Sequence, residues 1–258
     1  MELQKVNEAL NTYIRPGTFP VAVKMAKSAA EIPDKSRSPK RDMGVTMPVC
    51  QGVTIARRLG WLIAMGKEDM LCPLGALALG LVPAKAKFLD GSFNVPFWLK
   101  NQEVRAKFNR NLPRLEYGKY THVVLSPLHR ADFEPQVLII YGNPAQISRL
   151  IQSVIYSTGD PIISSSAGGF ACGSEIATPI LTDKYQVIIT GGGDRTIAQA
   201  DDHELAFVVP MSKVEALIEG LEATHKAGMR YPTPSFLLYQ AQFSPAFAEL
   251  MDYLRQGD

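Results

Sequence analysis

The stretch that decides the fold covers residues 136–155, QVLIIYGNPAQISRLIQSVI. Its first part, Val137 to Tyr141, is a short continuous apolar run of the kind that forms a buried strand. Asn143-Pro144 then opens a helix, because proline is favoured in the first helical turn. The apolar residues that follow share one face of that helix: Ile147, Leu150, Ile151, Val154 and Ile155. A strand followed directly by an amphipathic helix indicates a fold that combines both elements.

The flanking sequence continues this mixture. Apolar periodicity predicts helices at 3–14, 51–59, 74–81, 101–110, 173–181, 214–227 and 245–253, and strands at 19–25, 123–126, 186–190 and 207–209. The strands at 123–126 and 137–141 are expected to be neighbours, and a hairpin is one way to join them. Because strands and helices do not alternate strictly, we expect an α/β or α+β fold with a mixed β-sheet covered by helices. The chain length suits a single domain over 1–258, with two packed lobes that meet near residues 115–120 as the alternative.

Composition and charge exclude several classes of protein. The 258 residues are 46% apolar and 20% charged, as in an ordinary globular protein. A formal net charge of +2 provides no electrostatic footprint for nucleic acid or anionic lipid, so a small-molecule ligand or a redox partner protein is expected instead. The first thirteen residues lack the apolar core of a signal peptide, and no apolar stretch approaches the ~20 residues of a membrane span. We therefore expect a soluble cytoplasmic protein without a membrane or nucleic-acid partner, and leave open whether it forms a homo-oligomer.

The three cysteines occupy similar local settings. Each stands where a helix is expected to begin, beside glycine or proline, in Pro48-Val49-Cys50-Gln51-Gly52, Leu71-Cys72-Pro73-Leu74-Gly75 and Ala171-Cys172-Gly173-Ser174-Glu175. The N-terminus of a helix lowers a thiol pKa and stabilises the thiolate that binds metals. Cysteines that serve only as small buried hydrophobes would instead fall within a periodic apolar face. We therefore expect Cys50, Cys72 and Cys172 to converge on one metal-binding site.

The spacing of these cysteines favours an iron–sulfur cluster. Structural zinc commonly uses four ligands in Cys-x-x-Cys pairs, and this sequence contains no such pair. Three thiolates can hold a [4Fe–4S] cluster whose fourth iron is open to another residue, an exogenous ligand or a substrate. His129 and His203 are weaker candidates for that fourth ligand. The sequence thus predicts a cluster for electron transfer or for non-redox catalysis at an open iron, and leaves open whether the protein is an enzyme.

Two glycine-rich segments are further candidates for the site. Gly191-Gly192-Gly193-Asp194-Arg195 follows an expected strand, and its backbone N–H groups could approach a cluster or a phosphate. The Rossmann fingerprint fails at Thr196, which stands where glycine is required. The residues 164–169, Ser-Ser-Ser-Ala-Gly-Gly, lead into Cys172 and could line the same cavity. The candidate cofactor-binding set is Cys50, Cys72, Cys172, Gly173, Gly193, Asp194 and Arg195.

Other interpretations remain beside the cluster. The Gly/Ser-rich loops could belong to a metal-free module that binds a small anion or regulates a partner, or one cysteine could be a nucleophile. Gly191 to Arg195 could also be a tight turn stabilised by an Asp194–Arg195 interaction. We expect Arg57 and Arg58, on the helix after Cys50, to form a solvated face rather than a substrate clamp. The motifs of serine hydrolases, zincins and P-loop nucleotidases do not occur in the chain.

Several short motifs together resemble a known family. They are Arg15-Pro16 before the strand Pro20 to Lys24, Cys50-Gln51, Cys72-Pro73-Leu74-Gly75, Cys172-Gly173, and Gly193-Asp194-Arg195 before Pro210. Their order resembles the domain of unknown function 169 family of archaea and bacteria, over roughly residues 5–230. The resemblance implies that cysteines at these positions recur in the family. It also implies cytoplasmic proteins, often of anaerobic prokaryotes, a setting that suits an oxygen-sensitive cluster.

Overall fold

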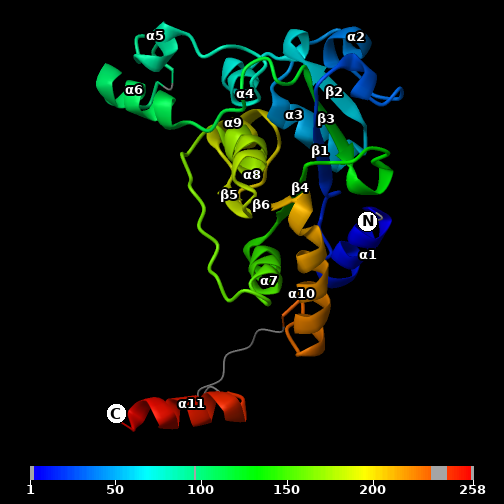
Figure 1. Cartoon of the computed structure of the whole chain (residues 1–258), viewed down its shortest axis with the longest axis vertical. Helices are drawn as coiled ribbons and strands as arrows, with labels where there is room; N and C mark the ends of the chain where they lie inside the picture. Colours follow the sequence, from blue (N-terminus) through cyan, green and yellow to red (C-terminus); the bar gives the residue numbers. More distant parts are fainter. Residues whose placement is uncertain (1–2, 96, 234–242, 257–258) are drawn as a thin grey trace.

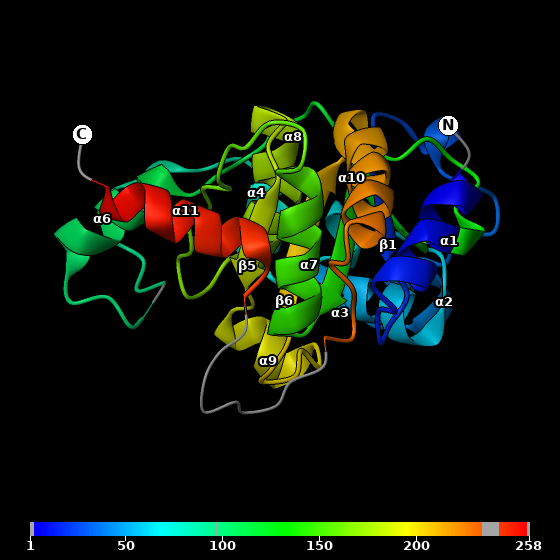
Figure 2. The ribbon, with the colours of Figure 1, turned by 90° about the horizontal axis from the view of Figure 1, so that it is seen from below.

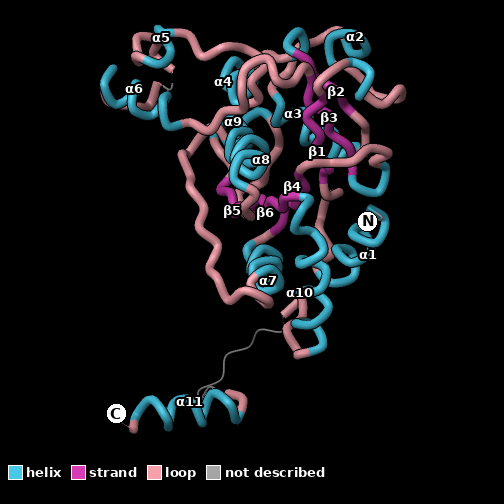
Figure 3. Tube along the Cα trace, viewed as in Figure 1, coloured by secondary structure: helices cyan, strands magenta, loops and turns pink. Residues whose placement is uncertain are grey.

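A six-stranded antiparallel sheet forms the centre of the computed structural model, which describes residues 3–95, 97–233 and 243–256. The strand order is β2-β3-β1-β4-β6-β5, and each pair of neighbours is antiparallel. The strands are β1 (Val21–Ala26), β2 (Ile63–Gly66), β3 (His122–Pro127), β4 (Val137–Gly142), β5 (Gln186–Ile189) and β6 (Leu205–Pro210). The central strands are apolar on both faces because helices cover both sides of the sheet (Figures 1 and 3).

Three long helices cover one face of the sheet. They are α1 (Leu3–Tyr13), α7 (Pro144–Val154) and α10 (Val214–Lys226), which lie together in both ribbon views (Figures 1 and 2). Leu10, Leu150 and Leu217 are fully buried in one apolar cluster with strand residues such as Phe207. A Cβ atom on Gly220 would lie only 1.8 Å from the carbonyl oxygen of Ser153, so glycine lets α10 approach the backbone of α7.

Shorter helical segments cover the opposite face, and this is the layer that carries the cysteines. It contains α3 (Val49–Thr54) with its π-helical continuation η2 (Ile55–Leu59), α4 (Pro73–Ala78), the π-helical η5 (Gly173–Ala177) with α8 (Thr178–Thr182), and α9 (Gly192–Ile197). Buried side chains of this layer, among them Val53 and Ile176, pack against Val23, Ile139 and Val208 of the sheet. Elsewhere in the described part of the chain lie four 3-10 turns: η1 (Ala29–Glu31), η3 (Lys67–Asp69), η4 (Leu128–Arg130) and η6 (Met211–Lys213).

The remaining helices lie at the periphery. They are α2 (Pro39–Met43), α5 (Ala86–Leu89), α6 (Gln102–Asn111) and the C-terminal α11 (Pro245–Arg255), which stands apart from the sheet (Figure 1). Of the helices that the structure describes, none has the length and apolarity of a bilayer span.

Of the two fold classes expected from the sequence, the α+β fold with a sheet covered by helices is confirmed. The sheet is not mixed, because all neighbouring strands are antiparallel. The suggested hairpin of β3 and β4 is wrong, because β1 lies between them: Val21 pairs with Pro127 on one side and with Ile139 on the other. In that central position β1 buries its apolar residues on both faces. The short strand β2 was missed, since four residues are too few for a clear period; it pairs with β3 through Ile63 and Leu125.

Candidate functional site

The three cysteines lie on one face of the sheet, each at the start of a helical segment. Cys50 is the second residue of α3, Cys72 is the N-cap residue of α4, and Cys172 directly precedes η5. A Cβ atom on Gly75 would lie 3.9 Å from Sγ of Cys172, so the first turn of α4 packs against that thiol. All three thiols are free, and all three residues are partly exposed. The fold therefore brings together cysteines that are far apart in the sequence.

The charges around the thiols are acidic. Burial, together with negative charge on Asp194, Glu175 and Cys72, raises the pKa of Cys50 to about 12. Burial also raises the pKa of Cys172, with further contributions from Cys72, Asp194, Cys50 and Glu175. The expectation that helix N-termini lower the pKa values is thus wrong for Cys50 and Cys172, because burial and neighbouring acids outweigh the helix dipole. Three thiols and two carboxyl groups share one site.

Sequence reasoning missed two members of this site, Glu175 and Tyr141. The carboxylate of Glu175 is buried and accepts a hydrogen bond of 3.0 Å from the hydroxyl of Tyr141. Burial, together with the negative charge of Asp194, raises the pKa of Glu175 to about 8. The available signal was the spacing, because residues three apart, such as Cys172 and Glu175, share one face of a helical segment. The site can therefore hold a proton next to its thiols.

The glycine-rich turn before α9 contacts the Ser/Gly-rich loop before Cys172. A Cβ atom on Gly191 would lie 2.9 Å from Cα of Gly169, so the two backbones meet at van der Waals distance. The N–H of Gly191 donates to Oδ2 of Asp194 at 2.9 Å. The carboxylate of Asp194 therefore occupies a backbone donor that an external anion would need. Burial raises the pKa of Asp194. The negative charge of Asp194 in turn raises the pKa of Cys50, and this couples the turn electrostatically to the cysteines.

Three other candidate residues, Arg195, Gly173 and Gly193, differ in what surrounds them. Arg195 forms an ion pair with Asp202 at 3.5 Å. The positive charge of Arg195 also opposes the rise in the pKa of Asp194, so the suggested Asp194–Arg195 interaction is electrostatic. Gly173 is tightly packed, since a Cβ atom there would lie 2.5 Å from the ring of Phe170. By contrast, a Cβ atom on Gly193 would meet no atom within 4 Å. Gly173 is therefore a packing residue of the site, and Gly193 borders open space.

Arg57 is buried, which overturns the expectation of a solvated face. Its Nη1 and Nη2 donate to the two carboxylate oxygens of Glu204 at 2.8 and 3.0 Å. The guanidinium also lies 4.1 Å from the ring centroid of Tyr141. The physical reason is the helical period, because Arg57 shares a face with buried Val53 and Ala56. Arg57 thus ties the cysteine-bearing α3 to the Tyr141–Glu175 pair.

Arg58 is partly exposed and pairs with Asp201 at 2.9 Å. The two histidines considered as fourth ligands lie elsewhere. The ring of His129 packs on Phe19 with centroids 4.7 Å apart, and His203 is exposed. Neither histidine is among the groups whose charge shifts the pKa of Cys50 or Cys172. The described contacts therefore give neither histidine a place at the site.

Across residues 3–95, 97–233 and 243–256, no three His, Cys, Asp or Glu side chains come close enough to hold one metal ion. A mononuclear zinc site needs every donor within about 2.0–2.3 Å of the same ion. In an iron–sulfur cluster each cysteine binds a different iron, so the sulfurs need not meet at one point. The donor arrangement is therefore not that of a preformed single-ion site.

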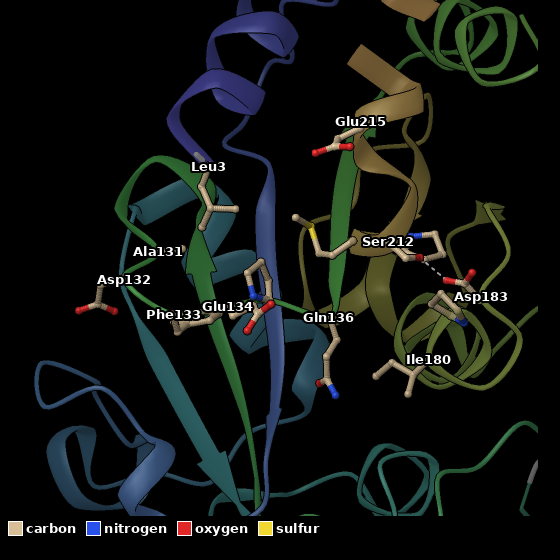
Figure 4. Close-up of a pocket in the computed structure, with 14 residues that line it drawn as sticks. Leu3, Ala131, Asp132, Phe133, Glu134, Gln136, Ile180, Asp183, Ser212 and Glu215 are labelled. Carbon is tan, nitrogen blue, oxygen red and sulfur yellow. Dashed lines mark hydrogen bonds between the residues drawn. The ribbon is translucent and has the colours of Figure 1, made fainter. Parts of the chain in front are cut away.

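A cavity of about 930 Å³ is lined by residues other than those of the thiol site, and Figure 4 shows its lining. It is bounded by the start of α1, the connection between β3 and β4, and the region of α8 and η6. Phe133 and Ile180 contribute apolar surface, while Glu134 and Glu215 contribute carboxylates. This cavity shares no lining residue with the thiol site. The residues with reactive side chains are therefore not those that line this cavity.

The fold and the site define an α+β protein with a cluster of thiols and carboxyl groups on one face of an antiparallel sheet. The chain belongs to the DUF169 family, described as "Uncharacterised ArCR", whose model matches residues 9–220. An uncharacterized protein of Methanocaldococcus jannaschii is 26% identical over 211 residues, which cover 78% of this chain and 86% of the relative. No solved structure matches the chain.

Proposed function

We propose that the chain is an iron–sulfur protein in which Cys50, Cys72 and Cys172 bind a [4Fe–4S] cluster. The observation that carries the proposal is the grouping of three free thiols from distant parts of the sequence at one site. Glu175 and Asp194 add two more acidic groups. When ionised, these thiolates and carboxylates repel one another. A cationic iron centre would offset that repulsion and stabilise the thiolates.

The neighbouring residues suit roles around such a centre. When bound, a cluster with one open iron supplies either one-electron transfer or a Lewis acid. Glu175 and Tyr141 can hold a proton beside the site, because they share a buried hydrogen bond. Arg57 places a positive charge over Tyr141 and fixes the position of α3 through Glu204. We also propose a cytoplasmic location, since a reducing compartment would keep the three thiols free.

The alternative of a metal-free anion site has weaker support. Anion sites in glycine-rich turns rely on unoccupied backbone N–H groups. Here the N–H of Gly191 already donates to Asp194, and buried Glu175 contributes further negative potential when ionised. A nucleophilic role for Cys50 or Cys172 is also disfavoured, because a reactive thiol needs a lowered pKa and both of these pKa values are raised.

Anaerobic purification tests the proposal. Iron and acid-labile sulfide should be present in the ratio of a [4Fe–4S] cluster, and replacing any one cysteine (Cys50→Ser, Cys72→Ser or Cys172→Ser) should lower both. The matched control is Ser126→Ala, a buried change on β3 that should leave the iron content unaltered. Far-UV circular dichroism checks that each variant is folded. A colourless, iron-free wild-type protein after anaerobic reconstitution would refute the proposal.

A further inference from the structure

The segment from residue 85 to residue 119, called the basic lobe below, carries a charge opposite to that of the rest of the chain. It contains α5 and α6 and projects to one side of the sheet, beyond α4 (Figure 1). Eight basic and three acidic residues give it a net charge of +5, so the remainder of this +2 chain carries −3. The basic residues are Lys85, Lys87, Lys100, Arg105, Lys107, Arg110, Arg114 and Lys119.

The arginines and lysines of the basic lobe have different roles. Arg105 donates to the carbonyl of Gly91 at 3.1 Å, and Arg114 donates to the carbonyl of Asn109 at 2.6 Å. These bonds stabilise the loops around α6. The lysines are exposed, and no ion pair among the described residues involves a basic residue of the lobe. The lysine charges are therefore available to a partner.

An aromatic patch lies in the middle of the lobe sequence. Phe93, Phe97 and Trp98 are 57%, 76% and 51% exposed. The rings of Phe97 and Trp98 meet edge to face, with centroids 5.6 Å apart. A Cβ atom on Gly169 would lie 3.0 Å from the indole of Trp98, so this ring packs on the loop that leads to Cys172. The exposed aromatic surface therefore borders the thiol site.

We propose that the basic lobe is a docking surface for an acidic protein, with Phe93, Phe97 and Trp98 at its centre and the lysines at its rim. Protein interfaces commonly combine an aromatic centre with a charged rim, and exposed lysines steer an oppositely charged partner. The charge selects an acidic partner rather than a dimer formed lobe to lobe, in which two positively charged surfaces would face each other.

The packing of the rings favours a protein over single-stranded nucleic acid. Stacking of successive bases needs open ring faces, whereas Trp98 contacts Phe97, Phe108 and the backbone near Gly169. Exposed Val95 adds aliphatic surface that suits protein side chains. Two of the arginines, which would be the best phosphate ligands, already bind carbonyl groups of the lobe.

A purified acidic ferredoxin is the probe for a binding experiment on the full chain. Only this choice of probe rests on the proposed function, because a cluster that transfers electrons needs an electron carrier as its partner. The lobe variant replaces Lys85, Lys87, Lys100 and Lys107 by glutamate. The control variant replaces Lys5, Lys35, Lys184 and Lys226 by glutamate, which are also exposed and give the same change in net charge.

We expect the wild-type protein to bind the ferredoxin more weakly as salt rises. The lobe variant should lose about tenfold or more in affinity, while the control variant should stay within about twofold. Phe97→Ser should also weaken binding, although it changes no charge. Iron-free Cys50→Ser protein should bind like the wild type, so a failure of the cluster proposal would leave this result intact.

Four outcomes would overturn the docking proposal. They are no binding of the ferredoxin, equal losses in the lobe and control variants, tighter binding of a uridine oligonucleotide than of the ferredoxin, and a dimer in solution that the lobe variant dissociates.

Discussion

The ion pair between Arg57 and Glu204 allows a stability prediction worked from the structure. The side chain of Arg57 is fully buried, and its two terminal nitrogens contact both carboxylate oxygens of Glu204. Glu204→Gln preserves the shape but leaves the guanidinium charge without its counter-ion. Removing one partner of a buried pair costs about 3–5 kcal/mol. For a chain of this size that corresponds to a fall in Tm of roughly 6–20 °C.

Urea unfolding at pH 7, followed by circular dichroism, measures this loss. Glu219→Gln on the exposed side of α10 is the matched control and should change stability by less than about 0.5 kcal/mol. The double variant Arg57→Met with Glu204→Gln should be more stable than Glu204→Gln alone, because it removes the uncompensated charge. A loss below about 1 kcal/mol in Glu204→Gln, or a double variant that is still less stable, would refute this reasoning.

Three further predictions concern the site itself. Gly191→Ala should destabilise the protein by about 1–3 kcal/mol in thermal or urea unfolding, because its Cβ would collide with Gly169. The control Gly192→Ala should leave the stability unchanged, because open space surrounds that position. Equal effects of the two substitutions would contradict the close approach of Gly191 to Gly169. In the iron-free protein, the raised pKa of Glu175, about 8, lets the folded state keep a proton that the unfolded state releases above about pH 4.5. Stability should therefore fall as pH rises between these values, by up to about 1.4 kcal/mol per unit, and Glu175→Gln should flatten the dependence of the urea midpoint on pH. Cys50 should react with iodoacetamide at pH 8 at least about a hundredfold more slowly than a free thiol, because burial raises its pKa to about 12; a rate near that of free cysteine would show that its surroundings are not acidic and buried.

Local sequence patterns were sufficient for most of the elements. The apolar period of residues 147–155 and the proline at 144 define α7, and the apolar run at 137–141 defines β4, because both signals act between near neighbours in the chain. The same reasoning located the helix starts at all three cysteines. It failed for β2, whose four residues carry too little pattern, and for the position of β1 between β3 and β4, which depends on pairing between distant segments.

The sequence by itself determined that helices cover a sheet in an α/β or α+β fold, the major helices and the placement of each cysteine at a helix start, since these follow from local propensity and periodicity. The antiparallel pairing that makes the fold α+β was decided by contacts between distant segments. Only the tertiary structure decided that Tyr141 and Glu175 join the thiols and that Arg57 is buried against Glu204. The tertiary structure likewise decided that the pKa values of Cys50 and Cys172 are raised rather than lowered. The burial of a thiol and the charges around it depend on which residues the folded chain places beside it. The start of a helix lowers the pKa of an exposed thiol. At Cys50 and Cys172 the pKa is raised instead, because these thiols lie in a low-dielectric surrounding with acidic neighbours.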